Sequence, residues 1–295
     1  FRSDLLSTAF ALLALLAWVD WVRRQQRSRL VAASLLALAA AMAKPSMIVL
    51  PALFLLIDLY EQRPRQRRML LDKIPVATAM AVVLGINLTL TRAAAAAPPL
   101  GYRLACIPWM LRGWGIRFFH LQPPTQFHSW PEASAGTLLL QGLPFLVGYA
   151  ILFIGLLRLR RPDWWFGMAF AMIAFLPAIG TVIDGRKFVT ADRYGYFPLV
   201  GLFFLTAMIG RVLRGRARSV FFFALVVWSG LGIRRTWLTV DEWRDDVSLW
   251  QAAAEKGTAD KHVRLNLGVA YEERGQYLKA AEQYHAAVKE DMAFV

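Results

Sequence analysis

The sequence predicts an all-α protein, in which a polytopic helical membrane domain of about eight spans is followed by a water-exposed helical segment. Hydrophobic residues make up 57% of the chain and charged residues only 18%, with a mean hydropathy of +0.43, which is well above the usual range of a water-soluble domain. Apolar segments recur along the first 238 residues, and strongly basic connectors follow every second one of them. These two patterns predict the spans and their alternation.

The distribution of charge separates the chain into two regions. The net charge of +14 alone would also suit a nucleic-acid-binding protein. However, residues 239–295 contain 7 Lys/Arg and 11 Asp/Glu, whereas residues 1–238 contain the remaining 27 and 9. The positive excess therefore lies among the apolar segments, so we expect no nucleic-acid partner and place the domain boundary at 238/239.

Eight segments approach the roughly 20 apolar residues that a helix needs to cross a bilayer. The second and third are short and are separated only by "KPS", so they form either a tight hairpin or a re-entrant pair, with Pro45 ending the first of them. A further stretch, Leu104 to Leu121, mixes apolar and basic residues and suits a helix at the outer surface. The eight predicted spans are Leu5–Val22, Leu30–Ala43, Ser46–Tyr60, Ile74–Leu90, Thr137–Leu157, Trp164–Ile183, Phe197–Ile209 and Val220–Ile233.

Four basic connectors predict the orientation of these spans. They read "RRQQRSR" at 23, "EQRPRQRRMLLDK" at 61, "RLRR" at 158 and "RVLRGRARS" at 211, and they follow the first, third, fifth and seventh spans. The positive-inside rule makes their side cytoplasmic. In a bacterium, the opposite side, which receives Lys44, the loop before the seventh span and the C-terminal segment, is the periplasm. We therefore expect an integral inner-membrane protein.

The C-terminal segment, residues 239–295, has the spacing of a tetratricopeptide repeat (TPR). The 34 residues from Lys261 to Phe294 match the length of that helical hairpin. The packing positions of the repeat fall on Leu267, Gly268, Tyr271, Ala280, Tyr284 and Ala287. "DVSLWQAAAEKG" before it is similar to the second helix of a preceding repeat, so we expect one and a half repeats of a longer array. The alternative is an amphipathic hairpin without repeat partners.

Charged residues in the outer loops admit two interpretations. Charged groups near membrane depth are costly unless they are paired or face water, so they mark a candidate site. In a structural role, Asp192 caps the incoming helix and pairs with a nearby Arg, while Tyr194 and Tyr196 anchor the interface. In a binding role, Lys44, Arg186 and Arg193 hold the phosphate of a lipid-linked donor and the tyrosines stack on its sugar.

Four stretches resemble one enzyme family: "RSDLLSTAFALLALLAW", "AKPSMIVLPALFLLIDLY", "TADRYGYFPLVGL" and "WRDDVSLWQAAAEKGTADKHVRLNLGVAYEERGQYLKAAEQY". Together they look like the bacterial relatives of the transmembrane and TPR O-mannosyltransferases, over nearly the whole chain. The resemblance implies a GT-C-type membrane domain that transfers a sugar from a polyprenyl-phosphate carrier to an acceptor at the outer face. It also implies that Arg2, Asp4, Asp192 and Arg193 occupy motif positions facing that side.

The resemblance leaves the catalytic residue unassigned. Enzymes of the GT-C type carry a catalytic acid in a first outer loop, upstream of the segment with which this chain starts, so we expect a chain truncated at both ends without its general base. No cofactor is expected within the chain, no metal-ligand cluster is evident around Cys106 or elsewhere, and a role for a divalent metal is left open. The expected partners are membrane lipid, the lipid-linked sugar, and an acceptor protein or peptide bound by the TPR. The alternatives are a non-catalytic membrane-anchored TPR scaffold that recruits periplasmic partners and, less favoured, a transporter.

Overall fold

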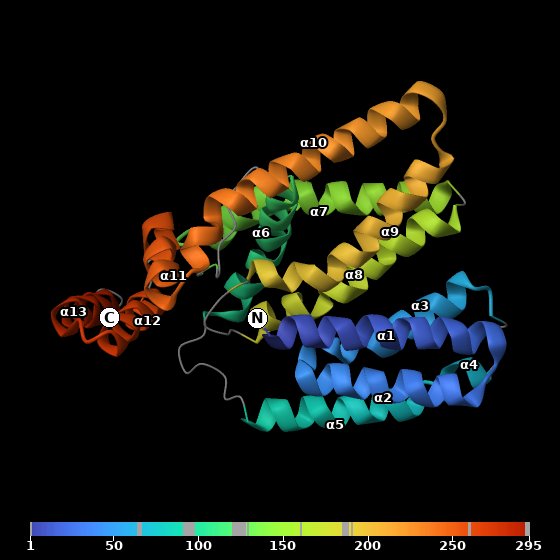
Figure 1. Ribbon diagram of the computed structural model, residues 1–295, viewed down its shortest axis with the longest axis horizontal. Helices are drawn as coiled ribbons and strands as arrows, with labels where there is room; N and C mark the ends of the chain where they lie inside the picture. The colour runs from blue at the N-terminus through green and yellow to red at the C-terminus, as the bar shows by residue number, and fades with distance from the viewer. Residues whose placement is uncertain are drawn as a thin grey trace.

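The computed structural model describes residues 2–63, 67–90, 98–119, 128, 130–159, 161–184, 189, 191–258 and 261–292, and within these ranges it contains helices and no β-strand. Figure 1 shows an elongated bundle with the C-terminal helices beyond one end. The α-helices are α1 (Arg2–Arg24), α2 (Arg27–Ala43), α3 (Leu50–Tyr60), α4 (Arg67–Leu71), α5 (Ile74–Leu90), α6 (Leu100–Phe118), α7 (Ala135–Arg158), α8 (Pro162–Ile183), α9 (Tyr196–Val212), α10 (Gly215–Thr239), α11 (Asp246–Ala253), α12 (Lys261–Glu273) and α13 (Tyr277–Met292). Short helical turns are η1 (Pro45–Val49), η2 (Asp192–Gly195), η3 (Val240–Trp243) and the π-turn η4 (Ala254–Thr258).

Every predicted span is helical. Six helices in the described part of the chain are long and apolar enough to cross a membrane: Ser3–Arg24, Met69–Asn87, Ala135–Arg158, Pro162–Ile183, Arg193–Val212 and Gly215–Trp243. Pro45–Tyr60 is a shorter apolar helical stretch, and α2 is a helix of 17 residues. These helices indicate a membrane protein, while the count of eight spans stays a prediction.

The helix ends that flank the four basic connectors lie at one end of the bundle, on the right in Figure 1. The chain turns there from α1 to α2, from α3 to α5, from α7 to α8 and from α9 to α10. The start of α1, the α2–η1 junction, η2 and the C-terminal helices lie at or beyond the opposite end. The alternation read from the sequence is therefore reproduced by the arrangement of the helices.

Small residues allow the helices of the bundle to approach one another closely. Ala33, Ala37 and Ala40 recur on the buried face of α2, which packs along α1. A Cβ atom built on Gly201 of α9 would lie 2.5 Å from the carbonyl oxygen of Gly167 in α8. Such backbone proximity is how membrane helices gain van der Waals contact, because burial of apolar surface gives little advantage within lipid.

Helix α6 begins four residues before the stretch Leu104 to Leu121 that the sequence indicates as a surface helix. It runs without a break through Gly113 and Gly115 and contains Pro108. The cause lies in its packing on α7, where a Cβ atom on Gly142 would lie 2.2 Å from the backbone of Pro108. Gly115 likewise allows close packing on α7, because a Cβ atom there would lie 2.4 Å from the hydroxyl oxygen of Tyr149.

Helix α10 has no buried residue. Its apolar side chains, including Phe223, Val226 and Ile233, are exposed on several faces. Trp228 connects it to the bundle by donating its indole N–H to the backbone oxygen of Phe118 at 2.9 Å. Lipid contact around most of its circumference accounts for this composition.

The C-terminal helices pack as a small unit. A Cβ atom on Gly268 of α12 would lie 2.4 Å from the ring of Tyr284 in α13, so this position requires glycine. Leu267, Ala280 and Ala287 are buried, and Tyr271 packs beside the α11–α12 core. Gly275, with a φ of +71°, ends α12 in the left-handed region that glycine favours.

The start of α11 is tied to the turn after α12. Asp245 accepts the backbone N–H of Ser248 at 2.9 Å and pairs with Arg274 at 2.8 Å. The Ser248 N–H and then the Arg274 guanidinium hold the pKa of the Asp245 carboxyl well below its usual range. α12 and α13 thus form a compact helical hairpin, and its identity as a TPR stays a prediction.

Candidate functional site

A cavity of about 480 Å³ opens at the end of the bundle where α1 begins. This volume lies within the range of pockets that bind small molecules. Its walls come from α1, η1, α5, α8, η2 and α9, and apolar side chains such as Met47, Leu84 and Phe197 cover much of them. The polar and charged groups that line it include Asp4, Lys44, Asn87, Asp184, Arg193 and Tyr194.

Lys44 enters the cavity because Pro45 follows it. A residue before proline is disfavoured in the α region, and Lys44 accordingly adopts an extended conformation, with φ −156° and ψ 117°, that ends α2. The ammonium group donates a hydrogen bond to Oδ1 of Asp4 and lies 5.0 Å from the ring centroid of Tyr194. The proline thus places a cation at the end of an apolar helix.

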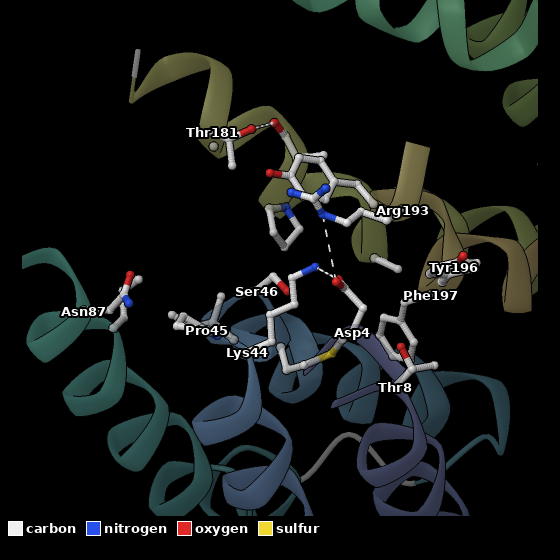
Figure 2. Close-up of a pocket in the computed structure, with 18 of the residues that line it drawn as sticks. Asp4, Thr8, Lys44, Pro45, Ser46, Asn87, Thr181, Arg193, Tyr196 and Phe197 are labelled. Atoms are coloured by element: carbon white, nitrogen blue, oxygen red, sulfur yellow. Dashed lines mark hydrogen bonds and ion pairs between the residues drawn. The ribbon is translucent and has the colours of Figure 1, made fainter. Parts of the chain in front are cut away.

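Asp4 is the group on which the charges converge (Figure 2). It lies in the first turn of α1 and is only 5% exposed. Besides the contact with Lys44, its Oδ2 lies 4.0 Å from Nε of Arg193. A carboxylate this deeply buried needs opposite charges beside it, and here two cations from distant parts of the chain provide them.

Arg193 and Tyr194 are positioned by the turn η2. Ala191 before it is buried, and its carbonyl oxygen accepts the N–H of Tyr194 at 3.0 Å. Gly195 packs so closely on the ring of Trp114 that a Cβ atom there would lie 1.6 Å from it. The guanidinium of Arg193 lies 5.6 Å from the ring centroid of Tyr194, so this ring contacts both cations of the site.

The structure brings five of the predicted site residues into one cavity: Lys44, Arg193, Asp4, Tyr194 and Tyr196. The other three lie wholly or partly beyond what the structure describes. Arg186 is outside the described residues, and for Arg2 and Asp192 only the backbone is described, at the starts of α1 and η2.

The predicted capping role of Asp192 differs from the observed helix start. Helix α9 begins at Tyr196 with Gly195 as its N-cap residue, and Asp192 lies in the preceding turn. Arg193 also faces Asp4, which lies 189 positions before it in the sequence. The pairing is tertiary, which a local pattern cannot reveal.

Five further polar residues of the cavity were not predicted as site residues: Thr8, Ser46, Asn87, Thr181 and Asp184. Asp184 follows the last turn of α8 and lines the cavity with an exposed side chain. Asn87 lines it from α5, on the side away from Arg193 (Figure 2). A lone amide near the end of an apolar span was the available signal for Asn87, and Asp184 stands in the charged loop itself.

A second buried charge cluster lies at the opposite end of the bundle. Asp58 of α3 is fully buried, accepts the indole N–H of Trp18 at 2.9 Å and pairs with Lys73. Arg63 lies 3.5 Å from the same carboxylate and 2.6 Å from Asp72. This cluster joins α1, α3 and the start of α5, and no cavity residue takes part in it.

Metal ligands do not gather in the described part of the chain, where no group of three or more His, Cys, Asp or Glu side chains is placed to hold an ion. The side chains that line the cavity include two cations, two carboxylates, an amide and aromatic rings beside an apolar wall. Such a set suits an amphipathic ligand with an anionic group. The sequence matches no family model, no curated protein and no solved structure.

Proposed function

We propose that this protein is a membrane glycosyltransferase that moves a sugar from a polyprenyl-phosphate carrier to a protein acceptor at the periplasmic face of a bacterial inner membrane. The observation that carries this proposal is the convergence of Lys44 and Arg193 on one cavity at a single end of the helical bundle. Cations held this close together beneath a membrane surface favour an anionic ligand.

The phosphate of the donor binds between Lys44 and Arg193 in this proposal. Arg presents a planar fork of donors to phosphate oxygens, and Lys acts as a compact charge beside it. Both cations already contact the ring of Tyr194, and Tyr196 lines the same cavity. The two tyrosines therefore stand where the sugar attached to that phosphate would lie.

The apolar wall of the cavity supports a lipid-linked donor over a soluble one. Met47, Ile48, Leu84 and Ala178 line it together with the charged groups. A polar head at the charged end with a hydrocarbon chain along this wall matches the chemistry of both parts of a polyprenyl phosphate.

The position of the C-terminal helices supports an acceptor role for them. They lie beyond the same end of the bundle as the cavity (Figure 1). With eight spans and the basic connectors in the cytoplasm, the cavity and these helices face the periplasm together. A TPR array that begins within residues 239–295 then presents a protein or peptide acceptor to the donor.

A second candidate function is partner recruitment by a membrane-anchored scaffold without catalysis. The exposed apolar side chains on α13, among them Leu278 at 85% and Tyr277 at 70% exposure, favour it, because such residues are typical of a surface that packs on a further helix or partner. In this case the cavity charges only hold α1, η1 and η2 together.

Sugar transfer by the full-length protein separates these candidates. Membranes that contain the protein are incubated with a radiolabelled polyprenyl-phosphate sugar and a protein fraction that contains the acceptor. The radioactivity transferred to protein is then measured. We expect Arg193→Ala to reduce transfer about 10- to 150-fold, since a charge-assisted phosphate contact contributes roughly 1.5–3 kcal/mol. Arg24→Ala, an exposed arginine at the opposite end, is the matched control. Unchanged transfer in Arg193→Ala, with the protein folded, would refute the proposal.

A further inference from the structure

Three arginines lie at the turn between α9 and α10, at the end of the bundle that carries the basic connectors (Figure 1). Arg214 is the residue before α10, and Arg216 and Arg218 lie in its first turn. All three side chains are exposed. Among the residues that the structure describes, none of the three pairs with a carboxylate, and Arg218 lies 5.7 Å from the ring centroid of Phe222. We call these three residues the arginine turn.

The carboxylates at this end of the bundle are engaged by other residues. Each of the five that the structure describes there contacts a cation or a hydroxyl group. The contacts are Asp20 with Arg29, Asp58 with Lys73, Glu61 with Arg23, Asp72 with Arg63, and Asp163 with Tyr60. The chain contains no Asp or Glu between Asp192 and Asp241, so α9 and α10 provide no carboxylate of their own. An anion that binds the arginine turn therefore comes from outside the described protein.

The arginine turn lies beside the part of α10 that contacts lipid. Val220 and Phe223 are exposed apolar residues in a helix that is long and apolar enough to cross a membrane. At a rise of about 1.5 Å per residue, Val220 lies only about 3 Å beyond Arg218 along the helix axis. The headgroup layer on each side of the hydrocarbon core is roughly 5–8 Å thick. The arginine turn is therefore at the level of the lipid headgroups.

From this placement we propose that the arginine turn binds the phosphate groups of anionic phospholipids. The guanidinium of arginine presents planar N–H donors that fit phosphate oxygens, and clustered basic residues next to a span attract an anionic leaflet. A phospholipid brings its phosphate to this level as part of the bilayer, whereas a soluble acidic protein has to displace headgroups to reach it. The inference is independent of sugar transfer, because the arginine turn lies at the opposite end of the bundle from the cavity.

The connector between α1 and α2 offers a comparison within the same protein. Two of its arginines, Arg23 and Arg29, share their charge with Glu61 and Asp20. Anionic lipid should therefore concentrate more at the arginine turn than at this connector. A zwitterionic lipid gains less at either place, because its own cation lies next to its phosphate.

Photo-crosslinking in nanodiscs tests the proposal. The full-length protein carries a benzophenone amino acid in place of Ala217, which is exposed and lies between Arg216 and Arg218. The nanodiscs contain equal amounts of phosphatidylglycerol and phosphatidylcholine with the same acyl chains, and mass spectrometry measures the two lipid adducts. We expect phosphatidylglycerol adducts to exceed phosphatidylcholine adducts at least about fivefold, which is the effect of one arginine near an anionic surface. The excess should fall in about 1 M salt, which screens exposed charges.

Substitutions in the arginine turn separate charge from position. Arg214→Gln, Arg216→Gln and Arg218→Gln in one protein should bring the two adducts to nearly equal yield, whereas lysine at the same three positions should keep most of the excess. Thermal melting checks that both variants are folded. The matched control site for the crosslinker is Ser28, an exposed residue between Arg27 and Arg29 in the α1–α2 connector, where we expect a smaller excess.

Three results would overturn the inference. They are equal yields of the two adducts at position 217, an excess that survives the glutamine substitutions, and an excess at position 28 as large as that at 217. Crosslinking at position 217 in whole cells provides a further check, since adducts with a protein or nucleic acid in place of lipid would show that the arginine turn has a different partner.

Discussion

Replacing Asp58 with asparagine should destabilise the protein more than any change at its surface ion pairs. The fully buried carboxylate of Asp58 pairs with Lys73, whose own exposure is only 6%. Asparagine keeps the size of the side chain and an oxygen for the Trp18 indole N–H, so the variant removes the charge and little else. Breaking a buried pair in this way costs about 3–5 kcal/mol, because the remaining charge stays buried.

Unfolding in mixed micelles with increasing denaturing detergent, followed by tryptophan fluorescence, measures this loss. Glu61→Gln is the control, since it breaks a pair in which the Arg23 side chain is 62% exposed, and we expect a change of at most about 1 kcal/mol there. Adding Lys73→Met to Asp58→Asn should recover at least about 2 kcal/mol by removing the orphaned charge. A loss below about 1 kcal/mol in Asp58→Asn, or no recovery in the double variant, would refute this reasoning.

Three further predictions concern helix packing, topology and pH. Gly201→Leu should lower the free energy of unfolding by about 1–3 kcal/mol through overpacking against α8, whereas Gly180→Ala, where a Cβ atom meets nothing within 4 Å, should leave thermal melting nearly unchanged; equal effects would contradict this packing argument. A reporter active only outside the cytoplasm should work when fused after Val295 and stay silent after Arg68, and the reverse pattern would overturn the proposed orientation. The depressed pKa of Asp245 contributes stability that is present above the ordinary pKa of about 4 and is lost as pH falls toward the folded pKa. The melting temperature of Asp245→Ala should therefore fall less between pH 5 and 3 than the melting temperature of the wild type.

Much of the architecture was predictable because membrane helices follow strong periodic rules. The apolar length of each segment predicted a helix, and the alternation of basic connectors predicted which helix ends lie together. Lys44 follows the second predicted span and Arg193 follows the sixth, so the alternation alone indicated that both lie at the same end of the bundle. The structure places both in one cavity.

The partners of individual charges were beyond prediction from the sequence. Asp58 was not singled out in the sequence, and its pairing with Lys73 depends on how α3 and the start of α5 pack. The same holds for Asp4, whose contact with Lys44 joins residues forty positions apart. The apolar periodicity of a segment predicts the depth of a residue in the membrane and its face on the helix. The ion pairs of Asp58 and Asp4 depend in addition on how each helix is rotated and on which helices pack beside it.

Because α10 has no buried residue, we expect the bilayer to influence its tilt and thereby the position of the C-terminal helices. Protein contacts hold the tilt of most membrane helices, but here Trp228 provides a pivot near the middle, and the further contacts of α10 with the bundle are few. A helix in this position adjusts to hydrocarbon thickness by tilting. Under the proposed function, tilting about Trp228 would shift α11 relative to the cavity, and we therefore expect membrane thickness to change the distance between the C-terminal helices and the cavity.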